Sequence, residues 1–376
     1  MRSNFGNTTL WDNNIVRIYG FSQKLAAPPT LPGPTLYVNE GDSLLVNAAN
    51  ISQLHTHTVH LHGMDADTKN DGDPFYYPIL HGASKIYRVL AKNAGTYMYC
   101  CHIEDVVHVQ MGMYGLLVVK AAGGVKTAWT GGPAFNNSYN WLTAELDKSW
   151  HDSIPERIDD TLKIPPYRPG YFLINGKSEQ QIDADDSIKI SASENEYIYV
   201  RLANIGNFNN RIVFPAALNA EIIDSDGRPL PNLINNDTVM TMPGERYGIM
   251  LHPLSQFKDS VSVSYINMDN DSIWNTQWVP VNIQGVFSVP EHANNNIMIY
   301  PNPASEWVNI IYKSKEKRNS VDFSIINSLG QLVMQEKKES TNNSFSVDVS
   351  SLNHGIYFIK ISAGDEYLYQ KMVISK

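Results

Sequence analysis

The feature that most constrains the fold of this chain is a series of short runs in which apolar and polar residues alternate. Examples are LYVNEGDSLLVNAAN, SKIYRVLA, SIKISA and VSVSYI, and Pro, Gly, Asn and Asp separate these runs. Alternation with a period of two is typical of half-buried strands, whereas helical periodicity is scarce along the chain. The sequence therefore predicts an all-β protein that is built from β-sandwich modules.

The chain has 376 residues, which is too long for one ordinary domain and suits two or three. The first predicted domain covers residues 1–122 and ends in GLLVVKAAGG, a strand followed by a glycine-rich exit. The second covers residues 123–289. The polar stretch SVPEHANNN precedes a third domain at 297–376, which is rich in Ser, Lys, Asn and Val and has no Cys.

Composition and charge exclude some classes of function. The formal net charge is −9 and no block of Lys and Arg is present, so binding to nucleic acid has little support. No apolar run approaches the roughly 20 residues of a membrane-spanning helix. The first residues, MRSNFGNTTLWDNN, have no apolar core of the kind found in signal peptides.

Potential metal ligands are concentrated in the first predicted domain. Seven of the 11 histidines lie between residues 55 and 108, and the chain has only two cysteines, Cys100 and Cys101. Neighbouring residues of a strand point to opposite faces, so these two cysteines are not expected to form a disulfide with each other.

Strand parity divides these side chains into two groups. Because side chains alternate between the faces of a strand, His57 is expected on one face and His60 and His62 on the other. The same rule separates neighbouring residues of YCCHI, unless a bulge interrupts the strand. The first group is His57 with Cys101, and the second is Cys100, His60, His62 and His102.

The residues that follow Cys101 extend the first group to four ligands. His108 and Met113 come after it with loop-compatible gaps. A thiolate, two imidazoles and a thioether form the soft, mixed donor set of a blue-copper site, in which the methionine is a weak axial ligand. Zinc would usually take four strong ligands without a thioether. We therefore predict copper at His57, Cys101, His108 and Met113.

Other polar residues nearby are expected to lie outside this site. His55 is expected to be exposed and His81 to be a loop residue. Four aspartates are expected in a solvated loop that could contact a cationic or phenolic substrate: Asp65, Asp67, Asp71 and Asp73.

Two stretches of the first domain resemble the multicopper oxidase family. HTVHLHG is similar to the histidine motif of that family, and CHIEDVVHVQMGMYG is similar to its Cys-His…His…Met segment. The resemblance implies the four residues above as type 1 copper ligands. It implies His60, His62 and His102 as ligands of a type 2/type 3 copper cluster. It also implies Cys101 and His102 as the catalytic residues, through which electrons pass from the type 1 copper to the cluster.

The middle segment resembles the second cupredoxin-like domain of the same family through YFLINGK, YVRLANIGN and DTVMTMPGERYGIML. The resemblance implies two cupredoxin-like Greek-key domains of the β-sandwich or barrel type, and relatives of this kind are commonly homotrimers. Two departures put a complete cluster in doubt. Cys100 replaces a family histidine, and the middle segment has no His-x-His, so only His151 or His252 of a neighbouring subunit could add an imidazole.

The last segment resembles the C-terminal sorting domain of the type IX secretion system. IYPNPASEWVNI, VDFSIINSLGQLV and VDVSSLNHGIYFIKIS carry this resemblance in order, and an ordinary adhesive sandwich domain is the alternative. A small β-sandwich and export to the cell surface or medium by the secretion machinery are implied. Because export needs a signal peptide, the start of the sequence is expected to be truncated.

These features lead to one main functional hypothesis. A secreted copper oxidoreductase would oxidise a small-molecule or metal-ion reductant one electron at a time. The reductant would dock near the imidazole edges of His57 or His108, which are expected at the surface. The electrons would then pass to a second copper and to dioxygen. The alternatives are a type 1 copper protein for electron transfer or copper binding, a nitrite-reductase-like enzyme, and a surface binding module with a decayed copper site.

Overall fold

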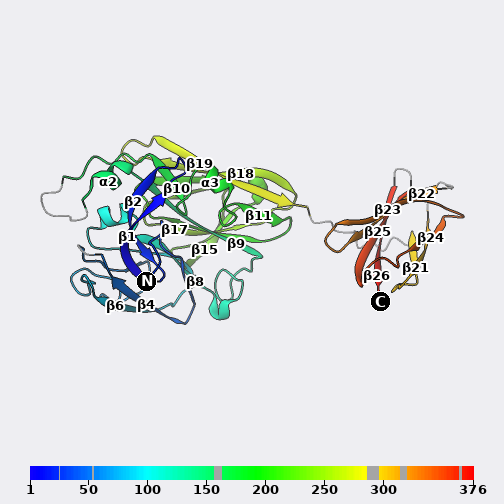
Figure 1. Ribbon diagram of the computed structural model, residues 1–376, viewed down its shortest axis with the longest axis horizontal. Coiled ribbons are helices and arrows are strands. Elements are labelled where there is room, and N and C mark those ends of the chain that lie inside the picture. Colours follow the sequence, from blue (N-terminus) through cyan, green and yellow to red (C-terminus); the bar gives the residue numbers. More distant parts are fainter. Residues whose placement is uncertain (25, 53–54, 156–162, 286–295, 314–319, 364–365) are drawn as a thin grey trace. The chain divides into compact units, whose positions relative to one another are not determined.

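The computed structural model describes all residues except 25, 53–54, 156–162, 286–295, 314–319 and 364–365. The chain divides into two compact units, Met1–Gly285 and Val286–Lys376. Figure 1 shows that strands dominate both of them. The prediction of an all-β chain is therefore confirmed.

Strands β1 to β8 form the first part of the larger unit, in two four-stranded sheets with the orders β2-β1-β4-β6 and β3-β8-β7-β5. Their bounds, with the one short helix, are β1 Arg2–Thr9, β2 Ile15–Ser22, β3 Leu36–Asn39, β4 Ser43–Asn50, β5 His60–His62, β6 Ser84–Leu90, β7 Gly95–Cys100, α1 Asp105–Gln110 and β8 Tyr114–Lys120. We call this part the first module. Strand β6 alternates between buried and exposed residues as its sequence predicts, whereas β7 is buried at every position.

Strands β9 to β19 form the second module, in a six-stranded sheet β10-β9-β12-β17-β14-β15 and a five-stranded sheet β11-β19-β18-β13-β16. Its elements are η1 Ala122–Gly124, β9 Asn137–Leu146, α2 Lys148–Ser153, β10 Tyr171–Ile174, α3 Gln180–Asp183, β11 Ile190–Ser193, β12 Ile198–Asn204, β13 Asn209–Val213, η2 Ala216–Leu218, β14 Glu221–Ser225, β15 Arg228–Asn235, β16 Thr238–Thr241, β17 Arg246–Leu251, β18 Phe257–Ile266 and β19 Ile273–Gln284.

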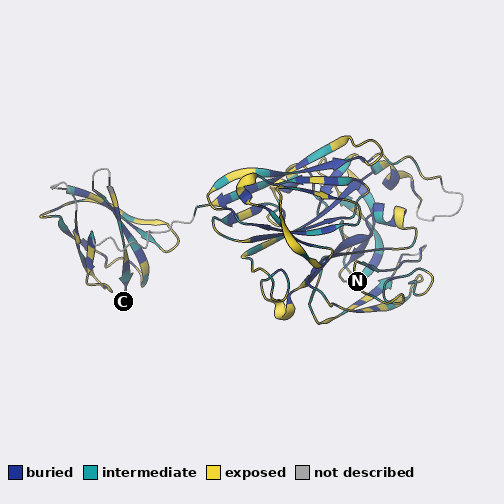
Figure 2. Cartoon of the chain, turned by 180° about the vertical axis from the view of Figure 1, so that it is seen from behind, coloured by how far each residue is buried: buried dark blue, intermediate teal, exposed yellow. Residues whose placement is uncertain are grey.

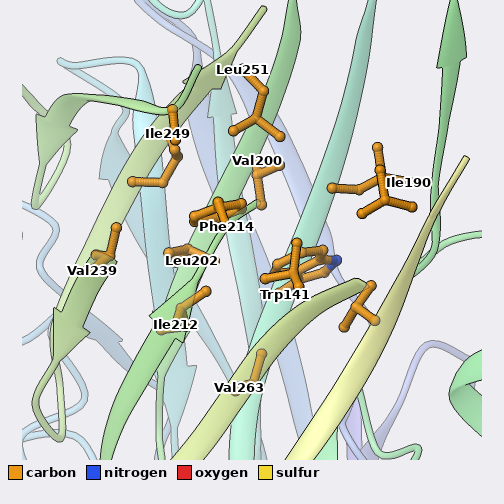
Figure 3. Packing of buried hydrophobic residues seen from close by; sticks show 14 of the residues in the cluster. Trp141, Ile190, Val200, Leu202, Ile212, Phe214, Val239, Ile249, Leu251 and Val263 are labelled. Atoms are coloured by element: carbon orange, nitrogen blue, oxygen red, sulfur yellow. The ribbon is translucent and has the colours of Figure 1, made fainter. Parts of the chain in front are cut away.

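The core of the second module lies between its two sheets. Trp141 stacks on Phe214 with ring centroids 6.1 Å apart, and aliphatic side chains of both sheets surround the pair (Figure 3). Burial of this apolar area is the main force that holds the sheets together.

A separate apolar cluster joins the two modules. Met98, Cys100 and Leu116 of the first module pack with Leu142 and Ala203 of the second. Strand β7 is therefore covered on both faces, because its odd-numbered residues Tyr97 and Tyr99 belong to the core of the first module instead. Figure 2 shows the buried residues along the strands of this unit.

The smaller unit contains a three-stranded sheet β20-β21-β24 and a four-stranded sheet β23-β22-β25-β26. Its strands are β20 Ile297–Tyr300, β21 Trp307–Tyr312, β22 Ser320–Asn327, β23 Leu332–Glu339, β24 Ser344–Asp348, β25 Gly355–Ala363 and β26 Glu366–Ile374. Val308, Ile310, Ile325 and Ile359 are buried in one cluster between the sheets. Among the described residues, no helix is long and apolar enough to cross a membrane.

Candidate metal centre

The loop that follows β7 brings three predicted ligands together through its own backbone. The amide of Cys101 donates to the carbonyl of Met113 at 3.0 Å, and the amide of Met113 donates to the carbonyl of His108 at 2.9 Å. Helix α1 fills the space between them, and it begins after Glu104, whose backbone is in the left-handed region with φ 46°. This helix was not predicted, since six residues carry too little periodicity to reveal it.

A thiol and two imidazoles meet at the centre of this arrangement. The Cys101 Sγ atom lies 3.3 Å from His108 Nδ1 and 3.7 Å from His57 Nδ1, and the three ligand atoms all lie within 4.8 Å of one another. His57 reaches this point from the adjacent segment. Its backbone pairs with Ile79, and its Nε2 atom is 2.8 Å from the Ser52 hydroxyl.

The site is closed to solvent, and burial sets the protonation of its groups. The four side chains of His57, Cys101, His108 and Met113 are at most 1% exposed. Burial lowers the pKa of His57 well below its usual value and that of His108 to about 3, and it raises the pKa of Cys101 to about 11. Both imidazoles are therefore neutral, and a metal ion would displace the thiol proton on binding.

The donor set fits copper. One thiol sulfur and two imidazole nitrogens converge, and Met113 belongs to the same apolar cluster as Cys101. The Nε2 atom of His108 is buried without a hydrogen-bond partner among the described residues, and the nearest carboxylate oxygen, of Glu104, is 3.5 Å away. This matches a ligand histidine that uses Nδ1 for the metal and turns Nε2–H toward a carboxylate.

The expectation that His55 is exposed is wrong. His55 is buried, its ring centroid lies 5.3 Å from that of His108 and 6.0 Å from that of His57, and its Nδ1 atom is 4.0 Å from Glu104. Tyr19 of β2 also contacts the His55 and His108 rings. These groups cover the imidazole edges of His57 and His108, so the expectation that those edges lie at the surface is wrong as well.

A second group of histidines lies on the other side of the same strands. The His60 and His102 rings stack with centroids 4.5 Å apart, and His62 lies 5.4 Å from His60. His102 is exposed, whereas the other two are half-buried. Burial lowers the pKa of His60, but contacts with Asp71, including one of 3.2 Å, raise it more, so the net shift is upward.

Residues of the second module complete the surroundings of His62. The Nε2 atom of His62 is 3.2 Å from the carbonyl oxygen of Gly244. Arg246, which donates to the same carbonyl, pairs with Asp226 at 3.0 Å. Burial, and after it the charge of Arg246, lowers the pKa of His62 to about 4. Arg246 belongs to the PGERY stretch, residues 243–247, for which no role beside the histidines was predicted, and this arginine was the signal for one.

The histidines of the second module do not contribute here. His151 is buried, and its Nδ1 atom is 2.5 Å from the carbonyl of Arg17 in β2. His252 stacks on Tyr197 with ring centroids 4.1 Å apart. Among the described residues, therefore, His60, His62 and His102 have no imidazole from the second module beside them.

Cys100 occupies a different environment from its neighbour. It pairs in register with His60 and packs in the cluster between the modules, and burial raises the pKa of its thiol. Both cysteines are free thiols.

His81, as expected, follows β5 in a loop, where its Nδ1 atom is 2.9 Å from the carbonyl of Ser52. The aspartate loop is only partly solvated, since Asp71 contacts His60 and Asp65 pairs with Arg228.

The fold is of the cupredoxin-like class. Residues 22–123 match the family model described as Multicopper oxidase, and residues 298–375 match the Secretion system C-terminal sorting domain. The chain therefore carries a multicopper oxidase domain and a C-terminal sorting domain, as the resemblances implied. Copper is the cofactor of that oxidase family.

Two curated relatives illustrate the extent of the similarity. Laccase-11 of Arabidopsis thaliana is 25% identical over 247 residues, which are 64% of this chain and 41% of the laccase. Multicopper oxidase MCE of Talaromyces pinophilus is 37% identical over 117 residues, 30% of this chain and 18% of that protein. The chain thus spans less than half the length of the curated relatives that it matches.

Solved structures share the fold at lower identity. The Blue Copper Oxidase from Nitrosomonas europaea matches with a TM-score of 0.58 and 24% identity, over 76% of this chain and 84% of that one. The copper nitrite reductase from the same organism matches with a TM-score of 0.55 and 17% identity, over 76% and 93%.

Proposed function

We propose that the chain is an exported, multicopper-oxidase-like oxidoreductase with a type 1 copper site at His57, Cys101, His108 and Met113. The observation that carries this proposal is the convergence of two Nδ1 atoms on the buried Cys101 sulfur, at 3.3 and 3.7 Å. Copper bound there would supply one-electron redox chemistry. The similarity of residues 22–123 to multicopper oxidases supports the same function.

The protein groups around the site have separate tasks. The Glu104 carboxylate lies 3.5 Å from Nε2 of His108, which favours a proton on Nε2 and leaves Nδ1 facing the thiolate. His55 and Tyr19, which pack against the imidazole rings, exclude water from the ligands. Because Glu104 is about 40% exposed while both ligand imidazoles are buried, the reductant docks on the surface around Glu104.

The proposed route for the electron continues through the peptide between Cys101 and His102. The amide of His102 donates to the Thr58 hydroxyl at 2.9 Å, so this peptide is held by the residue that follows His57. A second copper at His60, His62 and His102, with dioxygen as the acceptor, is the finer part of the proposal. A neighbouring subunit of a homotrimer would supply the remaining ligands.

A second candidate function is electron transfer or copper binding at a lone type 1 site. The specific observation in its favour is the position of Gly244 and Arg246 beside His62, where a positive charge disfavours a further cation. In this alternative the three outer histidines hold no copper. Turnover of nitrite would instead favour a reductase-like function.

The C-terminal unit extends the proposal to location and domain organisation. We propose three domains at residues 1–122, 123–289 and 297–376, of which the last directs the chain to the type IX secretion machinery and to the cell surface or medium. The match of residues 298–375 to a sorting domain supports this assignment.

Copper stoichiometry and electron paramagnetic resonance of the copper-loaded protein test these functions. More than one copper per chain, a type 2 signal and oxygen uptake with a phenolic or metal-ion reductant are expected for the oxidase. One copper with only a type 1 signal and no uptake would establish the electron-transfer alternative. Failure to bind copper would refute both.

A further inference from the structure

A cavity of about 350 Å³ lies where the two modules meet, apart from all of the histidines discussed above. Tyr37 of β3 and Lys120 of β8 line it from the first module, and Asn140 of β9 and Arg201 of β12 line it from the second. Gly124, Val125, Lys126 and Thr127 line it as well. The volume is within the range of pockets that hold small molecules.

Strand β12 explains why the cavity lies at this place. Alternate residues of the strand face the first module, and among them Ala203 is sealed into the apolar cluster that joins the modules. Arg201, two residues earlier on the same face, instead lines the cavity. It pairs in register with Asn140 of β9, so both side chains rise from adjacent strands of one sheet. Along this face of β12, the apolar contact between the modules is therefore followed by the polar cavity, which we call the chamber.

Arg201 is the central feature of this chamber. Its side chain is buried, with 4% of the residue exposed, and its Nε atom has no hydrogen-bond partner among the described residues. The guanidinium lies over the rings of Tyr199 at 4.2 Å and Phe135 at 5.6 Å. The nearby carboxylate of Asp224 accepts a hydrogen bond from the Tyr199 hydroxyl at 2.6 Å. A buried guanidinium without a direct anionic partner is costly.

The remaining polar groups of the chamber point to the same kind of ligand. Lys120 and Lys126 add two cations, and the described lining residues include no carboxylate. This is a local excess of positive charge in a chain whose net charge is −9. Thr127 Oγ1 and Asn140 Oδ1 are also buried without hydrogen-bond partners among the described residues. The chamber thus offers cationic donors, a hydroxyl and one open acceptor.

We propose that this chamber binds a small oxyanion that also carries a hydroxyl group, such as a hydroxycarboxylate or a hydrogen phosphate. The oxyanion pairs with Arg201, Lys120 and Lys126, since guanidinium and ammonium groups are the usual partners of carboxylates and phosphates. The hydroxyl of the ligand donates to Asn140 Oδ1. This site goes beyond the proposed copper function and does not depend on it.

Titration calorimetry on the full chain, in a buffer of low salt without oxyanions, tests the proposal. The probes are glycolate, acetate and inorganic phosphate. Glycolate differs from acetate by one hydroxyl, so it is expected to bind about tenfold more tightly if Asn140 accepts that hydroxyl. Saturable binding of phosphate but not glycolate would assign the site to phosphates, and the reverse result would assign it to hydroxycarboxylates.

Three variants decide whether the binding belongs to this chamber. Arg201→Met is expected to abolish it, and Lys126→Gln is expected to weaken it about threefold to tenfold. Lys258→Gln, an exposed lysine on β18, is the matched control and is expected to leave it unchanged. Lys126 is on a loop, so its variant keeps the test valid even if Arg201→Met misfolds. No saturable binding of any probe, or equal affinities in wild type and Lys126→Gln, would overturn the proposal.

Discussion

The Nε2 atom of His108 lies 3.5 Å from the carboxylate of Glu104, four residues earlier, while the Nδ1 atom of the same ring faces Cys101. A single imidazole thus lies between the Cys101 thiol and an acidic group that is also 4.0 Å from His55. The charge of Glu104 is therefore placed to tune any metal ion that His108 binds.

Replacing Glu104 with Gln is expected to preserve copper binding and raise the reduction potential of the copper site. Loss of a negative charge destabilises the oxidised form, and the expected rise is about 60 mV, a factor of ten in a one-electron equilibrium. Redox titration of the visible absorption measures it. Asp105→Asn, which neutralises the next carboxylate along the chain, is the control. An equal shift in both variants would argue against a special role for Glu104.

The two cysteines are expected to respond differently to serine. Cys101→Ser removes the thiolate and should abolish the intense visible absorption, whereas Cys100→Ser should keep it. Because Cys100 is packed among apolar side chains, its hydroxyl analogue should also cost about 1–2 kcal/mol in the free energy of unfolding. Absorption spectra and urea unfolding check both points, and the opposite pattern of colour would contradict the strand register.

Met113→Leu is expected to retain copper and to raise its reduction potential. A thioether is only a weak axial ligand, and an alkyl group in its place favours the reduced ion. Copper content and redox titration should be measured together. Met98→Leu, in the cluster between the modules, is a suitable control because it makes the same chemical change away from the site. Loss of copper from Met113→Leu would show that the methionine is a structural ligand.

Stability is expected to fall with rising pH because of Glu145. This carboxyl is fully buried, and burial raises its pKa to about 7, against about 4.5 for the unfolded chain. Between these values the folded form holds a proton that the unfolded form has lost, so its stabilising effect is complete below pH 4.5 and disappears as the pH rises to 7. The difference is about 3 kcal/mol. Urea unfolding of the copper-free protein at several pH values should show this slope, and Glu145→Gln should lack it.

Local patterns predicted the parts of the site that lie close together in the sequence. Alternation placed the strands, and the order of Cys101, His108 and Met113 indicated one loop with soft ligands. The cover over the site could not be predicted in this way. His55 is buried because Tyr19 of a distant strand packs against it, and Arg246 lies near His62 because the two modules associate. Contacts between residues so far apart along the chain leave no periodic trace.

Strand β7 has a consequence for how the protein could be observed. Met98 and Cys100 fix its one face in the contact between the modules, and Tyr99 fixes the other face in the core that surrounds Cys101. Any loosening of that contact would shift the strand that leads directly into the thiol ligand. The visible absorption of the copper-loaded protein would then report how firmly its two modules are joined.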